Sequence, residues 1–192
     1  MSAILLQVLP HIVSSLLYAI LGAHFWHTRW RDSSQGLVTR PMQPWERLTI
    51  FFALVVQAVG LYQGLFSAGG MRFSFSFALS LMLWLAVLIY WLESFRSRMD
   101  GLQPMVLPIA ALCALAPAIF PQLREVAHAG AWGFQLHFLT AMLAYSLFTL
   151  SALHAVFMSF AERKLHRRVV TRSLASLPPI LTMEALLFRM IL

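Results

Sequence analysis

Long apolar runs separated by short polar stretches are the main pattern along the chain. None of the runs alternates with the period of two that is typical of a half-buried strand. The hydrocarbon core of a bilayer is roughly 30 Å thick, so a helix needs about 20 apolar residues to cross it. Five runs reach that length within a few residues: 3–25, 48–67, 73–92, 104–120 and 132–160. The pattern predicts an all-α fold, a polytopic bundle of transmembrane helices.

The first run and the last two runs differ from the others in their flanking charges or in their length. No Lys or Arg precedes the first run, so we predict a retained span rather than a cleaved signal peptide. The fifth run would be about 43 Å long as a helix and is expected to tilt or protrude. A sixth run, residues 180–192, has about half the length needed to cross. We therefore expect a single membrane domain over residues 1–192 with a partial sixth span, and a chain truncated relative to a longer protein.

The composition supports this interpretation. Hydrophobic residues make up 60% of the 192 positions and charged residues only 11%, whereas soluble domains carry about 25% charged residues. This excludes a disordered chain, a nucleic-acid-binding domain and an ordinary soluble enzyme. The net charge of +7 is explained by the orientation of the spans rather than by a nucleic-acid partner. The single cysteine, Cys113, allows no intramolecular disulfide and no CxxC pair.

Lys and Arg are concentrated in alternate loops, which predicts the orientation. The loops after the first, third and fifth spans hold four, two and five of these residues, whereas the intervening loops hold only Arg72 and Arg124. We expect the basic loops, residues 26–47, 94–103 and 161–179, to be cytoplasmic. The N-terminus, the turn at residues 69–72 and the loop at residues 122–131 then lie outside.

His137 is the clearest candidate for chemistry. If Trp132 marks the outer interface, His137 lies about 7–8 Å down the fifth helix, where a polar ring needs a partner. At about 100° per residue its stripe collects mainly small residues. These are Ala141, Ala144, Phe148, Ser151 and Ala155. We expect this stripe to face the bundle or a cavity, with room for a second helix or a flat ligand. The alternative is a structural histidine bonded to a backbone carbonyl of a neighbouring helix.

The other histidines have ordinary explanations. His24 and His27 fall at the cytoplasmic end of the first span, and His11 near its outer end is expected to reach water. His154 lies 17 residues beyond His137 and about 100° around the helix, so the two cannot share a site. We predict that His154 packs on the inner face. His128 is different from these, because the same placement of Trp132 puts it in the external loop.

The fifth span and the segments after it carry a family resemblance. They resemble the cytochrome c assembly proteins, relatives of CcsA, CcmC and HemX, and in particular the YpjD branch. The matching segments are residues 136–148, Glu162-Arg163-Lys164-Leu165, Leu177-Pro178-Pro179, Met183-Glu184 and Leu186-Leu187-Phe188. The resemblance extends from about Pro104 to the end of the chain and is looser before it. The Trp-rich external motif of the heme-presenting members is absent, and Gln57 stands where relatives often have a histidine.

The resemblance implies a bacterial inner-membrane protein that handles heme near the outer face. In that family the residue matching His137 is a candidate axial ligand of heme iron, and we expect its partner to be His128 or a residue in the part of the family's proteins that this chain lacks. The chain would bind and position heme without catalysis, in contact with membrane lipid and with other cytochrome c maturation proteins. One alternative is a HemX-like regulatory or scaffold protein without heme. A second, a small-solute or ion transporter, is less favoured because no apolar run contains paired acids.

Overall fold

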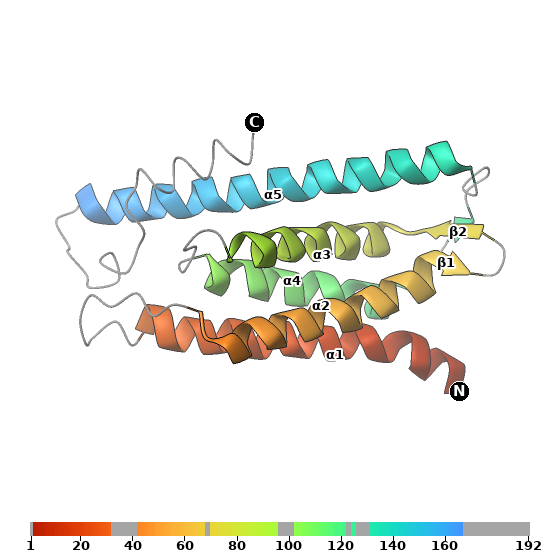
Figure 1. Ribbon diagram of the computed structural model, residues 1–192, viewed down its shortest axis with the longest axis horizontal. Coiled ribbons are helices and arrows are strands. Elements are labelled where there is room, and N and C mark those ends of the chain that lie inside the picture. The colour runs from red at the N-terminus through yellow and green to blue at the C-terminus, as the bar shows by residue number, and fades with distance from the viewer. Residues whose placement is uncertain are drawn as a thin grey trace.

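The structure, a computed structural model, describes residues 2–31, 42–67, 70–95, 102–121, 124–125 and 131–166. In these ranges five α-helices run along the long axis of the molecule, and short strands lie together at one end (Figure 1). The helices are α1 (Ser2–Phe25), α2 (Pro44–Leu65), α3 (Phe75–Glu93), α4 (Gln103–Ile119) and α5 (Trp132–His166), and a π-helical segment, η1 (Trp26–Arg31), continues α1. All five predicted helices are therefore present. The predicted sixth run lies outside the described residues.

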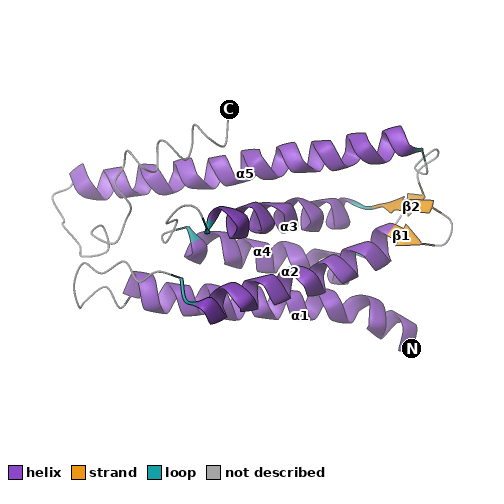
Figure 2. Cartoon of the chain, in the orientation of Figure 1, coloured by secondary structure: helices purple, strands orange, loops and turns teal. Residues whose placement is uncertain are grey.

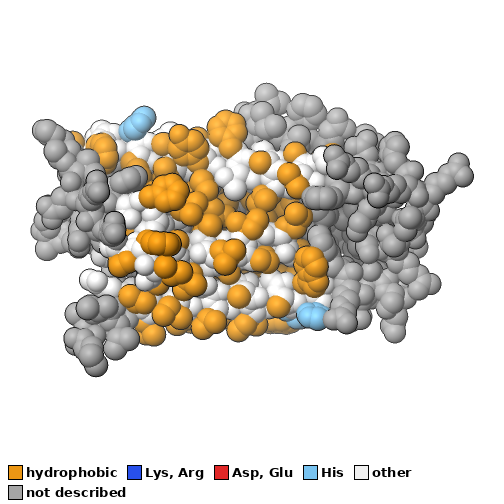
Figure 3. Space-filling view, turned by 180° about the vertical axis from the view of Figure 1, so that it is seen from behind, with side chains coloured by type: hydrophobic (Ala, Val, Ile, Leu, Met, Phe, Trp, Pro, Cys, Tyr) orange, Lys and Arg blue, Asp and Glu red, His pale blue; other side chains and the backbone are white. Residues whose placement is uncertain are grey.

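Four of these helices are long and apolar enough to cross a membrane. The qualifying segments are Gln7–Thr28, Pro44–Leu65, Phe75–Glu93 and Trp132–Val156. α4 has 17 residues and is about 26 Å long, shorter than the other four helices. Large hydrophobic side chains are exposed along the bundle, and Figure 3 shows them covering one face between its two ends. This surface indicates a membrane protein, because in water so large an apolar area would favour association.

The helices alternate in direction, and α1 to α4 form the packed part of the bundle (Figures 1 and 2). α1 packs most extensively against α4 and also against α2, while α3 lies against α4 and α2. α5 packs mainly on α3, at the edge of this group. We call the end that carries the strands the strand end. The first residues of α1, α3 and α5 and the last residues of α2 and α4 lie there.

Glycines allow close approaches between helices. Gly60 of α2 faces α1, where a Cβ built on it would lie 3.0 Å from Pro10 Cβ and 3.1 Å from His11 Cε1. One turn further on, a Cβ on Gly64 would meet the ring of Phe77 from α3. The two glycines form a Gly-x-x-x-Gly motif, which in membrane helices lets neighbouring backbones come close. α2 therefore receives a large side chain from each of two neighbours.

α1 and α4 are joined by a second close contact and a hydrogen bond. The Cβ of a residue in place of Gly22 would lie 3.1 Å from Cγ and Cδ of Pro108, so the proline ring fits against the glycine. The Ser15 hydroxyl donates a hydrogen bond of 2.8 Å to the carbonyl oxygen of Ala111. Pro108 lies inside α4 without ending it. Its ring instead provides part of the surface on which α1 packs.

The strands were not predicted from the sequence. β1 (Phe66–Ser67), β2 (Gly70–Phe73) and β3 (Arg124–Glu125) form an antiparallel sheet in the order β1-β2-β3. Its register pairs Arg72 with Glu125. Strands form here because these residues lie beyond the helix ends, where backbone N–H and C=O groups need other partners. The sheet links the α2–α3 connection to the α4–α5 connection.

Candidate functional site

His137 lies near the start of α5, with its side chain exposed. Within the described part of the chain its imidazole makes no hydrogen bond, so the alternative of a structural histidine held by a neighbouring carbonyl finds no support there. Ala144 and Phe148 of the same stripe are also exposed. The expectation that this stripe faces the bundle was therefore wrong at His137, Ala144 and Phe148, although Ser151, further along it, is buried. α5 buries only a narrow strip against α3, and Phe138 and Leu150 occupy that strip.

The other predicted residue of the site, His128, lies outside the described residues. The structure therefore does not test whether its ring lies near His137. His154 is 4% exposed and lies on the inner face of α5, as predicted. Among the described residues, no group of three His, Cys, Asp or Glu side chains is placed to hold a metal ion.

His11 differs from its prediction. It was expected to reach water, but it is only 2% exposed. Its ring packs edge-on against Phe77, with 5.4 Å between the ring centroids, and lies directly on Gly60. The Nδ1 atom has no hydrogen-bond partner among the described residues. The correction has a simple cause: Gly60 opens a recess on α2 that an imidazole from α1 fills.

Gln57 lies one helical turn before Gly60 and is also fully buried. Its Nε2 donates to the Ser80 hydroxyl at 3.0 Å and to the Ser80 carbonyl oxygen at 3.3 Å. These bonds tie α2 to α3 in the apolar core, while Oε1 has no partner among the described residues. Gln57 therefore acts here as a cross-helix tie.

A polar cluster joins α1 to α2 at the end opposite the strands. Glu46 is 4% exposed, and its Oε1 lies 3.0 Å from Nε2 of His24. Its Oε2 accepts a hydrogen bond of 2.8 Å from the backbone N–H of Gln43. With Pro44 as the first residue of α2, this is the carboxylate half of a capping box. The ring of Trp45 packs edge-on against His24, with 5.0 Å between centroids.

Sequence reasoning missed this cluster, although the signal was present. A proline followed two residues later by glutamate marks the start of a helix. The neighbouring Arg47 extends the cluster to α3: its Nη2 donates to the Ser94 carbonyl, and its own carbonyl accepts the indole N–H of Trp91. The cluster fixes helix ends by charge-assisted bonds. Its members make these bonds to one another, so its geometry is that of a structural joint.

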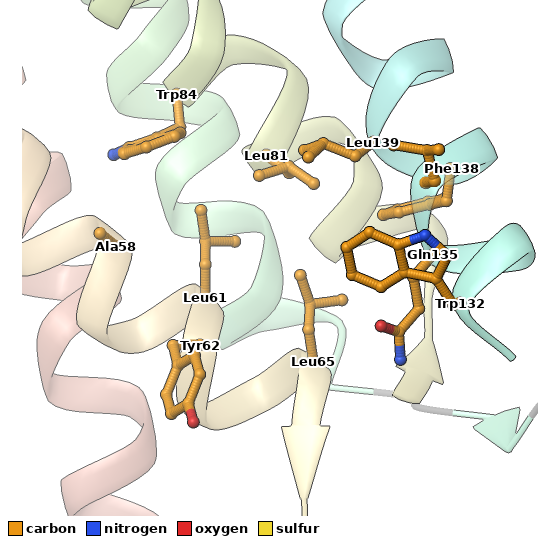
Figure 4. Close-up of a pocket in the computed structure, with 11 residues that line it drawn as sticks. Ala58, Leu61, Tyr62, Leu65, Leu81, Trp84, Trp132, Gln135, Phe138 and Leu139 are labelled. Atoms are coloured by element: carbon orange, nitrogen blue, oxygen red, sulfur yellow. The ribbon is translucent and has the colours of Figure 1, made fainter. Parts of the chain in front are cut away.

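A cavity of about 300 Å³ lies between α2, α3 and α5 (Figure 4). It is lined by Ala58, Leu61, Tyr62 and Leu65 of α2, by Leu81 and Trp84 of α3, and by Trp132, Gln135, Leu136, Phe138 and Leu139 of α5. His137 is not among the lining residues. It lies roughly 160° around α5 from Leu139, on the opposite side of the helix. The cavity and His137 are therefore separate features.

Comparison of the chain with family models, with curated proteins and with solved structures returned no match. The structure places one exposed imidazole and one apolar cavity near the strand end, on opposite sides of α5.

Proposed function

We propose that this chain is a non-catalytic membrane protein that binds or handles heme, of the cytochrome c assembly type. The resemblance of residues 136–148 and the segments after them supports the assignment. The helical bundle, with four helices able to cross a membrane, is the setting that such a role requires.

We infer five spans, with α4 as the shortest, in a bacterial inner membrane. Because the helices alternate in direction, the connections that follow α1 and α3 and the segment after α5 leave the bundle at the same end. These segments hold most of the Lys and Arg. The positive-inside rule then assigns that end to the cytoplasm and the strand end to the outside. His137 lies in the outer half of this arrangement.

The observation that carries the heme proposal is the exposed imidazole of His137. A polar ring without a hydrogen bond costs about 1–3 kcal/mol in apolar surroundings, and α5 is apolar enough to cross a membrane. Such a ring favours a partner that it can bind. Imidazole is a common axial ligand of heme iron. The small side chains of Ala141 and Ala144 project little from α5, so they leave room beside His137 for a flat ligand.

The described residues supply one candidate axial ligand for heme, the imidazole of His137. When bound, heme would supply an iron centre that accepts a nitrogen ligand and carries electrons. His137 would hold the iron, and the apolar side chains of α5 would contact the porphyrin edge. Within the described ranges no group of three His, Cys, Asp or Glu side chains could hold a metal ion. His128 remains the proposed second ligand.

The test is heme binding by the purified protein. The protein in detergent is titrated with hemin, and the Soret band is recorded for wild type and His137→Ala. His27, exposed at the other end of the bundle, supplies a matched control. We expect His137→Ala to weaken and shift the band and His27→Ala to leave it unchanged. A wild-type spectrum identical to free hemin in detergent, or equal spectra for both variants, would refute the proposal.

The second candidate is a scaffold role without heme, favoured by the uncovered side of α5. Leu136, Leu143 and Phe148 are 52%, 42% and 68% exposed on that helix. This function predicts that His137→Ala retains activity in the cell, whereas neutralising the basic residues of 163–172 abolishes it. Complementation of a deletion strain with the two variants distinguishes the candidates.

A further inference from the structure

The cavity between α2, α3 and α5 has a polarity gradient along its length. Figure 4 shows Ala58 and Trp84 toward one end, and Leu65 with the polar groups of Tyr62 and Gln135 toward the strand end. The segment of α2 that lines the cavity, from Ala58 to Leu65, is about 10 Å long. The lining is therefore almost entirely apolar, and the few polar groups beside it stand at the strand end, which is called the mouth below.

The deep end offers no polar group to an occupant. The one polar atom of the Trp84 side chain, Nε1, donates a hydrogen bond of 2.8 Å to the carbonyl oxygen of Leu54. The indole therefore presents ring carbon to the cavity. Leu61, Leu81 and Leu139 complete the apolar surface. A ligand with polar groups along its whole length would lose their hydration here without replacement.

The route into the cavity is lateral. α2 and α5 both pack on α3, but in the described residues they do not form a packed pair, so the cavity lies at the gap between them. Among the described residues nothing closes this gap, so in a membrane their arrangement opens it toward hydrocarbon. Lipid tails are as apolar as the wall, so occupancy depends on close packing and on the polar mouth rather than on the hydrophobic effect.

We propose that this cavity binds an acyl chain of a bilayer lipid, with the polar headgroup at the strand end beside Tyr62 and Gln135. A volume of about 300 Å³ is at the lower end of small-molecule sites and suits a single chain segment. The proposal requires only that the bundle lies in a membrane. It is independent of heme, because His137 is on the other side of α5.

The test uses Trp84 as a reporter of contact. The protein is reconstituted into vesicles of phosphatidylcholine that carries bromine on its acyl chains, and into unbrominated vesicles. Bromine quenches tryptophan fluorescence on contact, and the Trp84 component is the difference between wild type and Trp84→Phe. Ala58→Phe fills the cavity, and Val59→Phe, at a neighbouring position that is 46% exposed, adds the same ring outside it.

We expect brominated vesicles to abolish most of the Trp84 component in wild type and Val59→Phe, and Ala58→Phe to restore it. Leu139→Phe fills the cavity from α5 and replaces Ala58→Phe if that variant does not fold. An unquenched Trp84 in wild type, or quenching that neither filling variant reduces, would overturn the proposal. A competition experiment could also overturn it. In that case a fused-ring aromatic compound would displace the brominated chain, and so restore Trp84 fluorescence, at a lower concentration than a single-chain lipid does. Loss of heme binding in His137→Ala with normal quenching would leave the two sites independent.

Discussion

The Gly-x-x-x-Gly motif of α2 gives the sharpest test of the packing. In Gly64→Ala the added methyl group meets the ring of Phe77, which is 5% exposed and packs edge-on against His11. The ring has little freedom to move because these neighbours enclose it. Gly133, in the first turn of α5, provides the matched control, since a Cβ there meets no atom within 4 Å.

The expected magnitude follows from two opposing terms. Replacing glycine by alanine inside a helix stabilises it by about 1 kcal/mol, and this gain applies to both variants. Overpacking a filled site costs about 1–3 kcal/mol, and this cost applies only at Gly64. The free energy of unfolding should therefore be about 1–3 kcal/mol lower for Gly64→Ala than for Gly133→Ala.

The assay is equilibrium unfolding in mixed micelles with increasing dodecyl sulfate, followed by near-ultraviolet circular dichroism. Adding Phe77→Leu to Gly64→Ala makes room for the methyl group, so the double variant should lose less stability than the sum of its single changes. Equal stability of the two alanine variants, or strict additivity of the double variant, would refute this account of the α2–α3 contact.

Two further variants test the polar contacts. Glu46→Ala removes the hydrogen bond to His24 and the cap of α2, so it should lower the free energy of unfolding by about 1.5–3 kcal/mol. Glu46→Gln retains an acceptor oxygen and should cost less, and an equal loss in the same unfolding assay would contradict the capping role. Ser15→Ala removes the bond to Ala111 and should cost about 0.5–1.5 kcal/mol. Ser159→Ala serves as its control, because that hydroxyl is exposed and bonds within its own helix, and equal costs would show that the α1–α4 bond adds nothing.

The helices could be predicted because run length and hydropathy are local properties. α3 and α4 begin and end within two residues of their predicted bounds. α2 begins at Pro44 rather than at residue 48, because the cap formed by Glu46 allows residues 44–47, which include two charged side chains, to join the helix start. β1 and β2 form a local hairpin, but the β2–β3 pair joins segments about 50 residues apart, which hydropathy does not encode.

The orientation of α5 could not be predicted from its sequence. A helix that contacts lipid on one side and protein on the other has apolar residues all round, so no polar face marks the outside. The small residues around His137 indicated an inward face, but Phe138, one position on, took the contact with α3. Gly60 and Gly64 form a motif that the sequence alone shows. Nothing in the sequence indicates that the side chains of His11 and Phe77 occupy the space beside these glycines.

The bond from Ser15 to Ala111 has a consequence for biosynthesis, since 96 residues separate its two ends. α1 enters the bilayer long before the ribosome has made α4, its most extensive neighbour. Until then, α2 and α3 can cover His11, but the Ser15 hydroxyl lacks its acceptor on α4. The nascent chain thus passes through a stage in which the interior of the finished protein faces lipid, and completion of the fourth helix ends it.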